Sequence, residues 1–307
     1  MQTMYGATSG NQMIEEWLGQ MAWEALIEEV YTTPKPGLVD TYSNGAHKDM
    51  DVALFERSAS VLRPYFVRMA EAGYRSQKHP SGVFPELREI GIEAEKAMYA
   101  ATGNVNTHKG LIFSLGILCA AAASCLRWDG YVSVKNLIRT EQHMVRSALI
   151  AELKAIQEKK TDRSHGEELY RRLGTMGVRG EALGGYASIR TIGLPVMQEG
   201  IRKGYGWNEI KLQVLMEFMA QAEDTNVIYR TSEKTLEYTQ NIARQFLKNG
   251  GAYRKGAVEE LIKLDEQFIK ENISHGGCAD LLAITIFLHS VYNGFQSLRN
   301  LPIRRKL

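Results

Sequence analysis

Hydrophobic residues recur every three or four positions through most of the chain, which is the spacing of one face of an α-helix. Ile14, Trp17, Leu18 and Met21 show this spacing in the first such segment, and strand-like alternation is scarce. The pattern therefore predicts an all-α protein. Further helices are expected, with boundaries uncertain by ~2–4 residues, at about residues 51–73, 86–101, 107–127, 133–159, 167–173, 195–204, 207–222, 232–249, 255–271 and 277–298.

Glycine, proline and asparagine fall between the helical segments, as they do in connecting turns. They occur at residues 103–104, 174–185, 193–195, 204–206, 249–251 and 275–277. These breaks separate helices rather than domains, and the chain has no repeat of fixed period. We therefore predict a single multi-helix domain with Gly-rich functional loops over residues 10–307, preceded by a loose tail at residues 1–9.

The segment from Leu111 to Leu126 is apolar and rich in alanine. This run is shorter than the ~20 residues that a membrane-spanning helix needs, and it directly follows His108 and Lys109. We interpret it as a buried helix whose small side chains let neighbouring helices approach closely. No membrane association is predicted.

Composition narrows the possible partners and the compartment. The 37 basic and 35 acidic residues nearly cancel to a formal charge of +2, so no overall field attracts nucleic acid or an anionic membrane. Any anionic ligand must be held by a local cluster. The three cysteines are odd in number and lack a disulfide-framework spacing, and no secretory leader opens the chain, which predicts a cytoplasmic protein. The oligomeric state is left open.

The run from Thr33 to Asp51 contains two lysines, a histidine and three aspartates between two helical segments. Its prolines and its Asn-Gly pair rule out a continuous helix, and a loop of this length is usually functional or disordered. Leu38 and Val39 can fix the segment to a core, which favours a functional loop over a linker.

A second polar cluster, residues 103–110, leads directly into the apolar helix. Asn106 or Thr107 is a suitable N-cap, whereas Lys109 in a first turn opposes the helix dipole unless an anion lies between them. Exposed amides together with His108 and Lys109 would suit a phosphate group. A solvated lysine beside an ordinary cap is the alternative.

A third cluster, residues 176–190, places Arg179, Glu181 and Arg190 among several glycines. Glycine allows the backbone to approach a ligand, and arginine can bind phosphate with two hydrogen bonds. The spacing is not that of a P-loop, so an irregular connection is an equal alternative.

Further aspartates could complete an oxygen-rich site. Asp224 and Asn226 lie near a helix end, and Asp280 lies in the first turn of the last apolar helix, where compensation of the helix dipole is an ordinary role. If Asp224 and Asp280 converge with the loop aspartates, they would suit Mg2+ bound with a polyphosphate. No zinc site is predicted, because the cysteines lack paired spacing.

Six blocks occur in an order that resembles the triphosphoribosyl-dephospho-CoA synthase family, and they span about residues 25 to 290. Two departures from the family pattern are His275, where proline is expected, and Cys278, where serine is expected. The blocks are Pro34-Lys-Pro-Gly-Leu-Val-Asp40, Ser43-Asn-Gly-Ala-His-Lys-Asp-Met-Asp51, Asn106-Thr-His-Lys-Gly110, Arg179-Gly-Glu181, Asp224-Thr-Asn226 and Gly276-Gly-Cys-Ala-Asp-Leu-Leu282.

The resemblance implies an all-helical enzyme that joins ATP to 3'-dephospho-CoA, releases adenine and forms 2'-(5''-triphosphoribosyl)-3'-dephospho-CoA. The product would pass to an acyl carrier protein transferase as the prosthetic-group precursor for citrate lyase, or for malonate decarboxylase in a sister branch. Displacement of adenine from the ribose is a glycosyl transfer, which calls for carboxylates near the reacting carbon.

Individual roles are assigned as hypotheses. Asp40 or Glu181 is expected to be the base, and His47 is expected to lie on the purine side. The metal ligands are expected to be Asp49, Asp51 and Asp224. Contacts to the phosphates and the nucleotide are assigned to Lys35, Asn106, His108, Lys109, Arg179, Arg190, Asn226 and Asp280.

Other classes of protein remain as alternatives. An isoprenoid-diphosphate enzyme is disfavoured because no Asp-Asp-x-x-Asp motif occurs. A nucleotide N-glycosidase would release adenine without dephospho-CoA, and a non-catalytic helical adaptor would not bind ATP. Assays of adenine release and of ATP binding would therefore distinguish both of them from a synthase.

Overall fold

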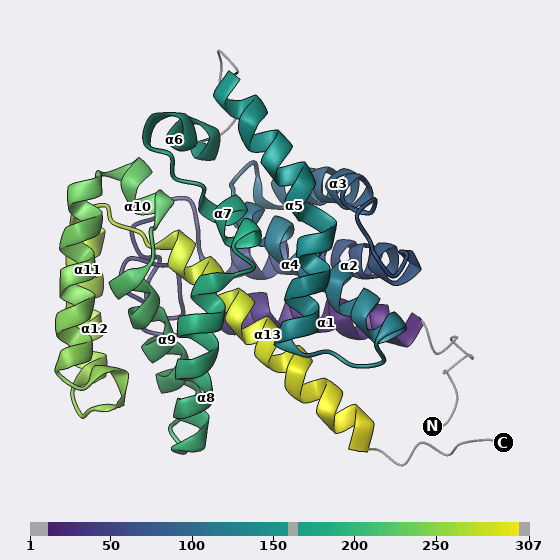
Figure 1. Ribbon diagram of the computed structural model, residues 1–307. Coiled ribbons are helices and arrows are strands. Elements are labelled where there is room, and N and C mark those ends of the chain that lie inside the picture. Colours follow the sequence, from purple (N-terminus) through teal and green to yellow (C-terminus); the bar gives the residue numbers. More distant parts are fainter. Residues whose placement is uncertain (1–11, 159–164, 301–307) are drawn as a thin grey trace.

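The computed structural model describes residues 12–158 and 165–300, and within these ranges the protein is all-α with no strand, as predicted (Figure 1). The predicted tail at residues 1–9 lies outside the described residues. The α-helices are α1 (Gln12–Val30), α2 (Val52–Arg75), α3 (Phe84–Thr102), α4 (Lys109–Trp128), α5 (Val134–Glu158), α6 (His165–Leu173), α7 (Gly177–Leu183), α8 (Leu194–Arg202), α9 (Trp207–Gln221), α10 (Thr225–Arg230), α11 (Glu233–Lys248), α12 (Ala257–Lys270) and α13 (Gly276–Asn300).

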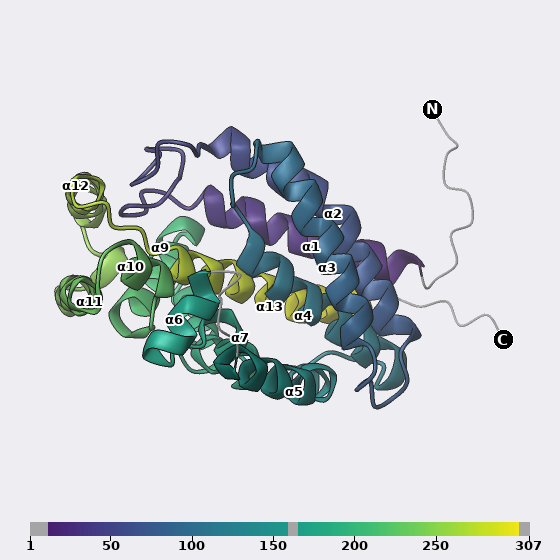
Figure 2. The ribbon, with the colours of Figure 1, turned by 90° about the horizontal axis from the view of Figure 1, so that it is seen from above.

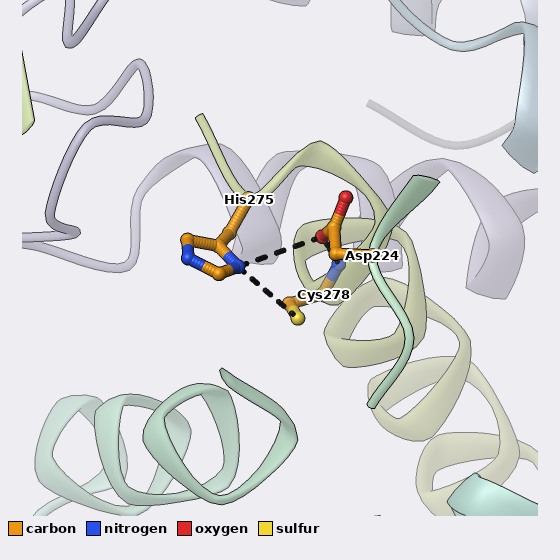
Figure 3. Close-up of side chains that lie close together, drawn as sticks. All are labelled: Asp224, His275 and Cys278. Carbon is orange, nitrogen blue, oxygen red and sulfur yellow. Dashed lines mark hydrogen bonds and ion pairs between the residues drawn. The ribbon is translucent and has the colours of Figure 1, made fainter. Parts of the chain in front are cut away.

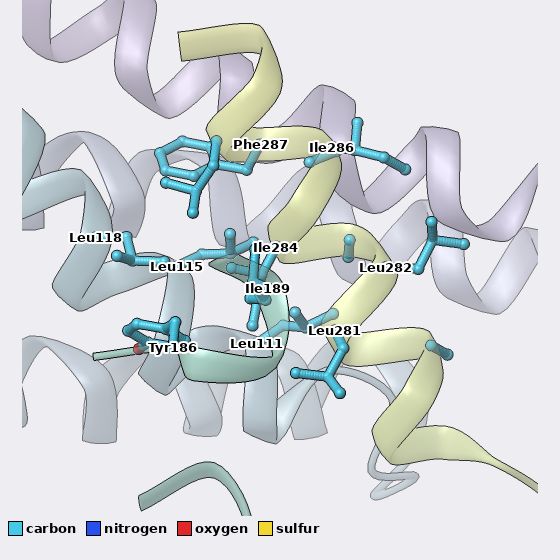
Figure 4. Packing of buried hydrophobic residues seen from close by; sticks show 14 of the residues in the cluster. Leu111, Leu115, Leu118, Tyr186, Ile189, Leu281, Leu282, Ile284, Ile286 and Phe287 are labelled. Atoms are coloured by element: carbon cyan, nitrogen blue, oxygen red, sulfur yellow. The ribbon is translucent and has the colours of Figure 1, made fainter. Parts of the chain in front are cut away.

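The helices surround two central ones, α4 and α13. Seen from above, α1, α2 and α3 lie on one side of this pair and α5, α6 and α7 on the other, while α11 and α12 form one end (Figure 2). Side chains of α4 and α13 meet in one core that also includes Tyr186 and Ile189 (Figure 4). One continuous hydrophobic cluster runs through the described part of the chain, which supports the prediction of a single domain.

Helix α4 is the predicted apolar segment, and it is buried around its whole circumference. It spans 20 residues, which is longer than the predicted apolar run. Among the described helices it is the one that is long and apolar enough to cross a bilayer. However, 78% of its most apolar window is buried inside the fold. Such burial is typical of a core helix, as the sequence predicts.

Most predicted helix boundaries agree with the structure to within a few residues, and four short elements were not predicted. These are α7, α10, a π-helical turn at Ile189–Gly193 and a 3-10 turn at Gly251–Tyr253. Each has seven residues or fewer, too short for a helical repeat to emerge. Helix α7 lies inside the predicted break at residues 174–185, and the 3-10 turn begins within the predicted break at residues 249–251.

Close approach of α2 to α4 depends on small residues on both helices. A Cβ added at Gly73 of α2 would lie 2.0 Å from the carbonyl oxygen of Ala120 in α4. The space is already filled by backbone atoms, which cannot rotate away as a side chain can.

Gly73→Ala should therefore destabilise the protein by about 1–3 kcal/mol, the usual range for overpacking. Gly91→Ala in α3 is a matched control, because its added Cβ would meet only Cε of Met69, at 3.7 Å. We expect the control to be neutral or up to about 1 kcal/mol more stable, since alanine favours a helix. Urea unfolding followed by circular dichroism measures both, and equal stabilities would contradict this account of the α2 and α4 contact.

Candidate functional site

The starts of four helices gather at one end of the core. A Cβ added at Gly110, near the start of α4, would lie 2.3 Å from Oδ2 of Asp280 in α13 and 3.4 Å from Cγ1 of Val178 in α7. One added at Gly276 would lie 3.0 Å from Nδ2 of Asn226 in α10. The polar clusters around residues 110, 178, 226 and 280 are therefore neighbours in space, although they are far apart in sequence.

The loop that follows α1 is held to this end of the core by carboxylates. Asp40 accepts hydrogen bonds at Oδ1 from the amides of Tyr42 (2.6 Å) and Ser43 (3.0 Å), and at Oδ2 from the amide of Lys35. Asp265 of α12 accepts from the Gly37 amide (2.8 Å) and from the Ser43 hydroxyl (2.7 Å). Both carboxylates fix the loop, and both oxygens of Asp40 are engaged.

Gly37 shows why this loop needs glycine. Its φ is +71°, and a Cβ there would lie 2.3 Å from the carbonyl oxygen of Ile273. The loop thus packs backbone to backbone against the segment before α13, and a larger residue would separate them.

A buried ion pair lies between this loop and α1. Nζ of Lys35 pairs with Oε1 of Glu29 and donates to the Glu29 carbonyl at 2.7 Å, and the two side chains are 1% and 6% exposed. Burial raises the pKa of Glu29, although Lys35 opposes that effect. Lys35, predicted to contact phosphate, is thus engaged in neutralising a buried glutamate.

Asp280 has a different environment from the other carboxylates of the site. No hydrogen bond within the described residues involves its side chain, and it faces Gly110 at the start of α4. Burial raises the pKa of Asp280 well above its usual range, and the neighbouring charges of Glu29 and then Asp224 add to the effect. Such a group is a candidate for proton transfer.

His108 is buried beside the same ion pair. Its Nδ1 is 2.7 Å from Oγ of Ser58, its ring makes an edge contact with Phe55, and its Nε2 has no hydrogen-bond partner. Burial, with a smaller contribution from Lys35, lowers the pKa of His108 to about 3. The imidazole is therefore neutral at physiological pH and would meet a ligand as a hydrogen-bonding group, not as a cation.

The remaining predicted cations already have partners. Nζ of Lys109 lies 2.9 Å from Glu95 of α3, and the Lys109 amide donates to Oδ1 of Asn106 at 3.2 Å. Arg179 pairs with Glu152 of α5 at 3.1 Å. The N-cap of α4 is His108 and not Asn106 or Thr107 as predicted, because the helix begins at Lys109, and the His108 side chain makes no capping hydrogen bond. A phosphate would have to compete with Glu95 for Lys109.

Glu181 lies in α7, and Arg190 lies in the π-helical turn between α7 and α8. Arg190 donates through Nε to the Gly185 carbonyl (2.8 Å) and through NH2 to the Gly184 carbonyl (3.3 Å). Oε1 of Glu181 accepts from the Ser188 hydroxyl at 2.5 Å, whereas its buried Oε2 has no partner. Arg190 thus supports the turn, and Glu181 keeps one oxygen unused.

His47, Asp49 and Asp51 lie at the outer part of the loop. Nε2 of His47 is 2.9 Å from Oγ of Ser274, and burial followed by the charge of Arg230 lowers the His47 pKa, while Asp49 opposes this. Asp51 caps α2 by accepting from the Leu54 amide at 2.7 Å. A cleft of about 450 Å³, lined by residues 40–44 and 51–53, opens beside them.

A similar hollow of about 430 Å³, lined by Gln157, Glu168, Arg171 and Arg172, contains none of the predicted site residues.

Asp224 joins two helices. Its Oδ1 accepts from the amides of Asn226 (2.9 Å) and Val227 (3.3 Å) at the start of α10, and its Oδ2 accepts from the Cys278 amide (2.9 Å) at the start of α13. His275 lies beside both residues (Figure 3). Among the described residues, Asp224, His275 and Cys278 form the one group of three whose donor atoms could hold a metal ion together. Asp49 and Asp51 do not belong to it.

Two residues of the site were not predicted from the sequence: Glu29, which neutralises Lys35, and Asp265, which holds the loop. The proximity of His275 to Cys278 and Asp224 was not predicted either. Glu29 and Asp265 occupy ordinary positions in amphipathic helices, so nothing in their spacing marks them. His275 and Cys278 are three residues apart, and Asp224 is separated from them by a whole helical hairpin. The two departures from the family pattern were the available signal.

The Lys35 and Glu29 pair can be tested by stability. Lys35→Met should cost about 3–5 kcal/mol, because it leaves Glu29 buried without a counter-charge. The double variant Glu29→Gln/Lys35→Met should recover much of that loss. Arg202→Met, which breaks the exposed pair with Glu199, should change stability little, because solvent screens such a pair. Urea unfolding measures all three, and a Lys35→Met loss as small as that of Arg202→Met would refute the role of the pair.

Comparison with known proteins agrees with this geometry. The family model described as ATP:dephospho-CoA triphosphoribosyl transferase matches residues 15–298. A Pectobacterium atrosepticum protein named 2-(5''-triphosphoribosyl)-3'-dephosphocoenzyme-A synthase is 40% identical over 273 residues, covering 89% of this chain and 88% of that protein. An Escherichia fergusonii protein of the same name is 37% identical over 272 residues, covering 88% and 89%.

A Photobacterium profundum protein named as a probable synthase of the same kind is 37% identical over 279 residues, covering 88% of this chain and 86% of that protein. No solved structure matches the chain. The matched region contains every residue assigned to the site, and both the family model and the relatives extend over nearly all of the described helices. The chain therefore belongs to the ATP:dephospho-CoA triphosphoribosyl transferase family.

Proposed function

We propose that this protein transfers the triphosphoribosyl group of ATP to the 2'-hydroxyl of 3'-dephospho-CoA and releases adenine. The bond from the ribose C1' to the adenine nitrogen breaks, and a bond from C1' to the acceptor oxygen forms. The acceptor hydroxyl loses a proton and the departing adenine gains one. The observation that carries the proposal is that the blocks that match the family meet around Asp280.

Asp280 is the proton acceptor that the geometry favours. Asp40 was predicted for this role, but both of its oxygens accept backbone amides, which holds it in the loop. Glu181 keeps one oxygen unused, but that oxygen is buried. The raised pKa of Asp280 brings its proton affinity toward the working pH, where a general base is most effective.

The carboxylates around Asp280 would also stabilise the transition state. Glycosyl transfer develops positive charge at the sugar ring, and carboxylates flank such centres in glycosidases. Glu29 and Asp224 are the charges that raise the pKa of Asp280, so they lie close enough to act on the same region. The site is thus suited to a cationic transition state.

In this proposal, the triphosphate is held by the amides at the starts of α4 and α13 and by cations that leave their glutamate partners to pair with phosphate. Helix N-termini bind phosphate through free amides and the helix dipole. Lys35, Lys109 and Arg179 would move from Glu29, Glu95 and Glu152 to phosphate oxygens. His108 would contribute a neutral hydrogen bond through Nε2, its unpartnered nitrogen.

Mg2+ would accompany ATP. Magnesium is usually held by one or two carboxylates together with substrate phosphates. The exposed Asp49 and Asp51 fit this requirement, because Asp51 uses only Oδ1 for its cap and lines the cleft beside the loop. Asp224 fits poorly, because the donors beside it are sulfur and nitrogen, whereas magnesium prefers oxygen.

His47 remains assigned to the purine side. Its lowered pKa keeps it neutral near pH 7, so it would hydrogen-bond to the departing adenine without carrying a charge. Transfer of the product to an acyl carrier protein transferase, in a citrate lyase or a malonate decarboxylase system, and a cytoplasmic location also belong to the proposal. The family resemblance supports the transfer step, and three cysteines without disulfides are compatible with the cytoplasmic location.

The activity is tested by incubating the protein with ATP and Mg2+, with and without 3'-dephospho-CoA. We expect adenine to appear by chromatography only when the acceptor is present, together with a CoA product heavier by one triphosphoribosyl group. Adenine release without the acceptor would indicate a nucleotide N-glycosidase. No adenine in either case would refute the proposal.

Asp280→Asn should lower kcat by about 10²–10⁴, the usual contribution of a general base. A base acts when deprotonated, so wild-type kcat/KM should rise as the pH passes upward through the Asp280 pKa, which lies above its usual range. That rise should be absent in the variant. Asp129→Asn, the same change just beyond the far end of α4, should keep the wild-type profile. A pH profile for Asp280→Asn parallel to wild type would exclude Asp280 as the base.

A further inference from the structure

Three buried side chains with different donor atoms lie close together at the starts of α10 and α13 (Figure 3). Nδ1 of His275 lies 3.8 Å from Oδ2 of Asp224 and 3.8 Å from Sγ of Cys278. The three donor atoms all lie within 4.8 Å of one another. His275 and Asp224 have fully buried side chains, and Cys278 is 1% exposed.

The imidazole of His275 lacks a normal hydrogen bond. Its Nε2 has no partner, and its Nδ1 makes only a long hydrogen bond with Sγ of Cys278, while Oδ2 of Asp224 lies beyond ordinary hydrogen-bond distance. Nδ1 is the nitrogen that faces the other two donors, and an ion bound there would replace a long sulfur contact with a stronger bond.

The donor set selects the kind of ion. Magnesium prefers oxygen donors, whereas one sulfur, one nitrogen and one carboxylate oxygen suit zinc and its neighbours in the transition series. Bond lengths of about 2.0–2.3 Å in a tetrahedral site separate the donors by about 3.3–3.7 Å. The two separations that involve Nδ1 of His275, 3.8 Å each, therefore need to shorten by only a few tenths of an ångström.

We propose that Asp224, His275 and Cys278 bind one Zn2+ ion, or a similar divalent transition-metal ion, which ties the start of α10 to the start of α13. Binding removes the thiol proton of Cys278, which is released to solvent. A thiolate, a carboxylate and a neutral imidazole then balance the double charge of the ion. Such a neutral assembly can be buried where separate charges cannot.

The surroundings orient the donors. Oδ1 of Asp224 accepts from the amides of Asn226 and Val227, whereas its Oδ2 accepts only from the Cys278 amide and keeps a lone pair for an ion. Hydrogen bonds of this kind hold ligands in place in known metal sites. The proposed ion is separate from the Mg2+ that would accompany ATP, and it does not depend on the reaction proposed above.

The experiment uses the full-length protein without a polyhistidine tag. The protein is incubated with Zn2+, freed of loosely bound metal with a weak chelator, and analysed by mass spectrometry for metal content. We expect about one zinc per chain. Replacement by Co2+ should produce the charge-transfer absorption of a cobalt–thiolate bond, and Zn2+ should raise the temperature of unfolding.

Cys278→Ser should lose the charge-transfer band, retain less than a tenth of the zinc and lose the thermal shift. Its volume changes little, so it should fold even if His275→Gln does not. Cys125→Ser is the matched control, because it replaces another buried thiol, on α4, whose neighbour is Thr140. This control should keep the full zinc content and the band.

A wild-type protein that retains no more zinc than Cys278→Ser, or a cobalt form without the thiolate band, would overturn the proposal. None of these readouts uses turnover. A protein that binds zinc but makes no product, or makes product without binding zinc, therefore separates the failure of one proposal from the failure of the other.

Discussion

The arrangement of this protein depends on complete burial of α4. A helix that is apolar around its whole surface must be covered on every side, so other helices have to surround it. The Gly73 and Ala120 contact shows how close that covering is. The two ends of α4 depart from this pattern: Arg127 and Trp128 are exposed at its end, and the polar Asn106, His108 and Lys109 lie at its start. The packing of the core therefore determines where polar chemistry can occur, at the end where α4, α7, α10 and α13 begin.

Burial at that end makes charge expensive, and the protein responds by pairing. Glu29 is neutralised by Lys35, Asp40 by backbone amides, and Asp224 by the starts of two helices. Asp280 is the exception, since it has like charges as neighbours and no hydrogen bond. The unpaired Asp280 carboxylate does not stabilise the fold as the paired ones do, which makes it the better candidate for a functional role.

Much of the fold could be predicted from the sequence because long amphipathic helices carry a repeated signal. The buried character of residues 111–126 and most helix boundaries follow from it. α7 and α10 could not be predicted, since six or seven residues contain too little periodicity. The polar clusters could be recognised in the sequence. The ion-pair partners of Lys109 and Arg179 could not be predicted, because Glu95 and Glu152 lie on other helices. Such contacts arise from tertiary packing, which spacing along the chain does not encode.

The internal pairing of the site's cations has a consequence for which anions the protein selects. Lys35, Lys109 and Arg179 each pair with a glutamate, so an anion that binds them as proposed would have to displace carboxylates. Inorganic phosphate or a nucleoside monophosphate can replace only one such carboxylate, with little net gain. A triphosphate can replace several at once. Under the proposed function, the same pairs would therefore favour an extended polyphosphate over small abundant anions.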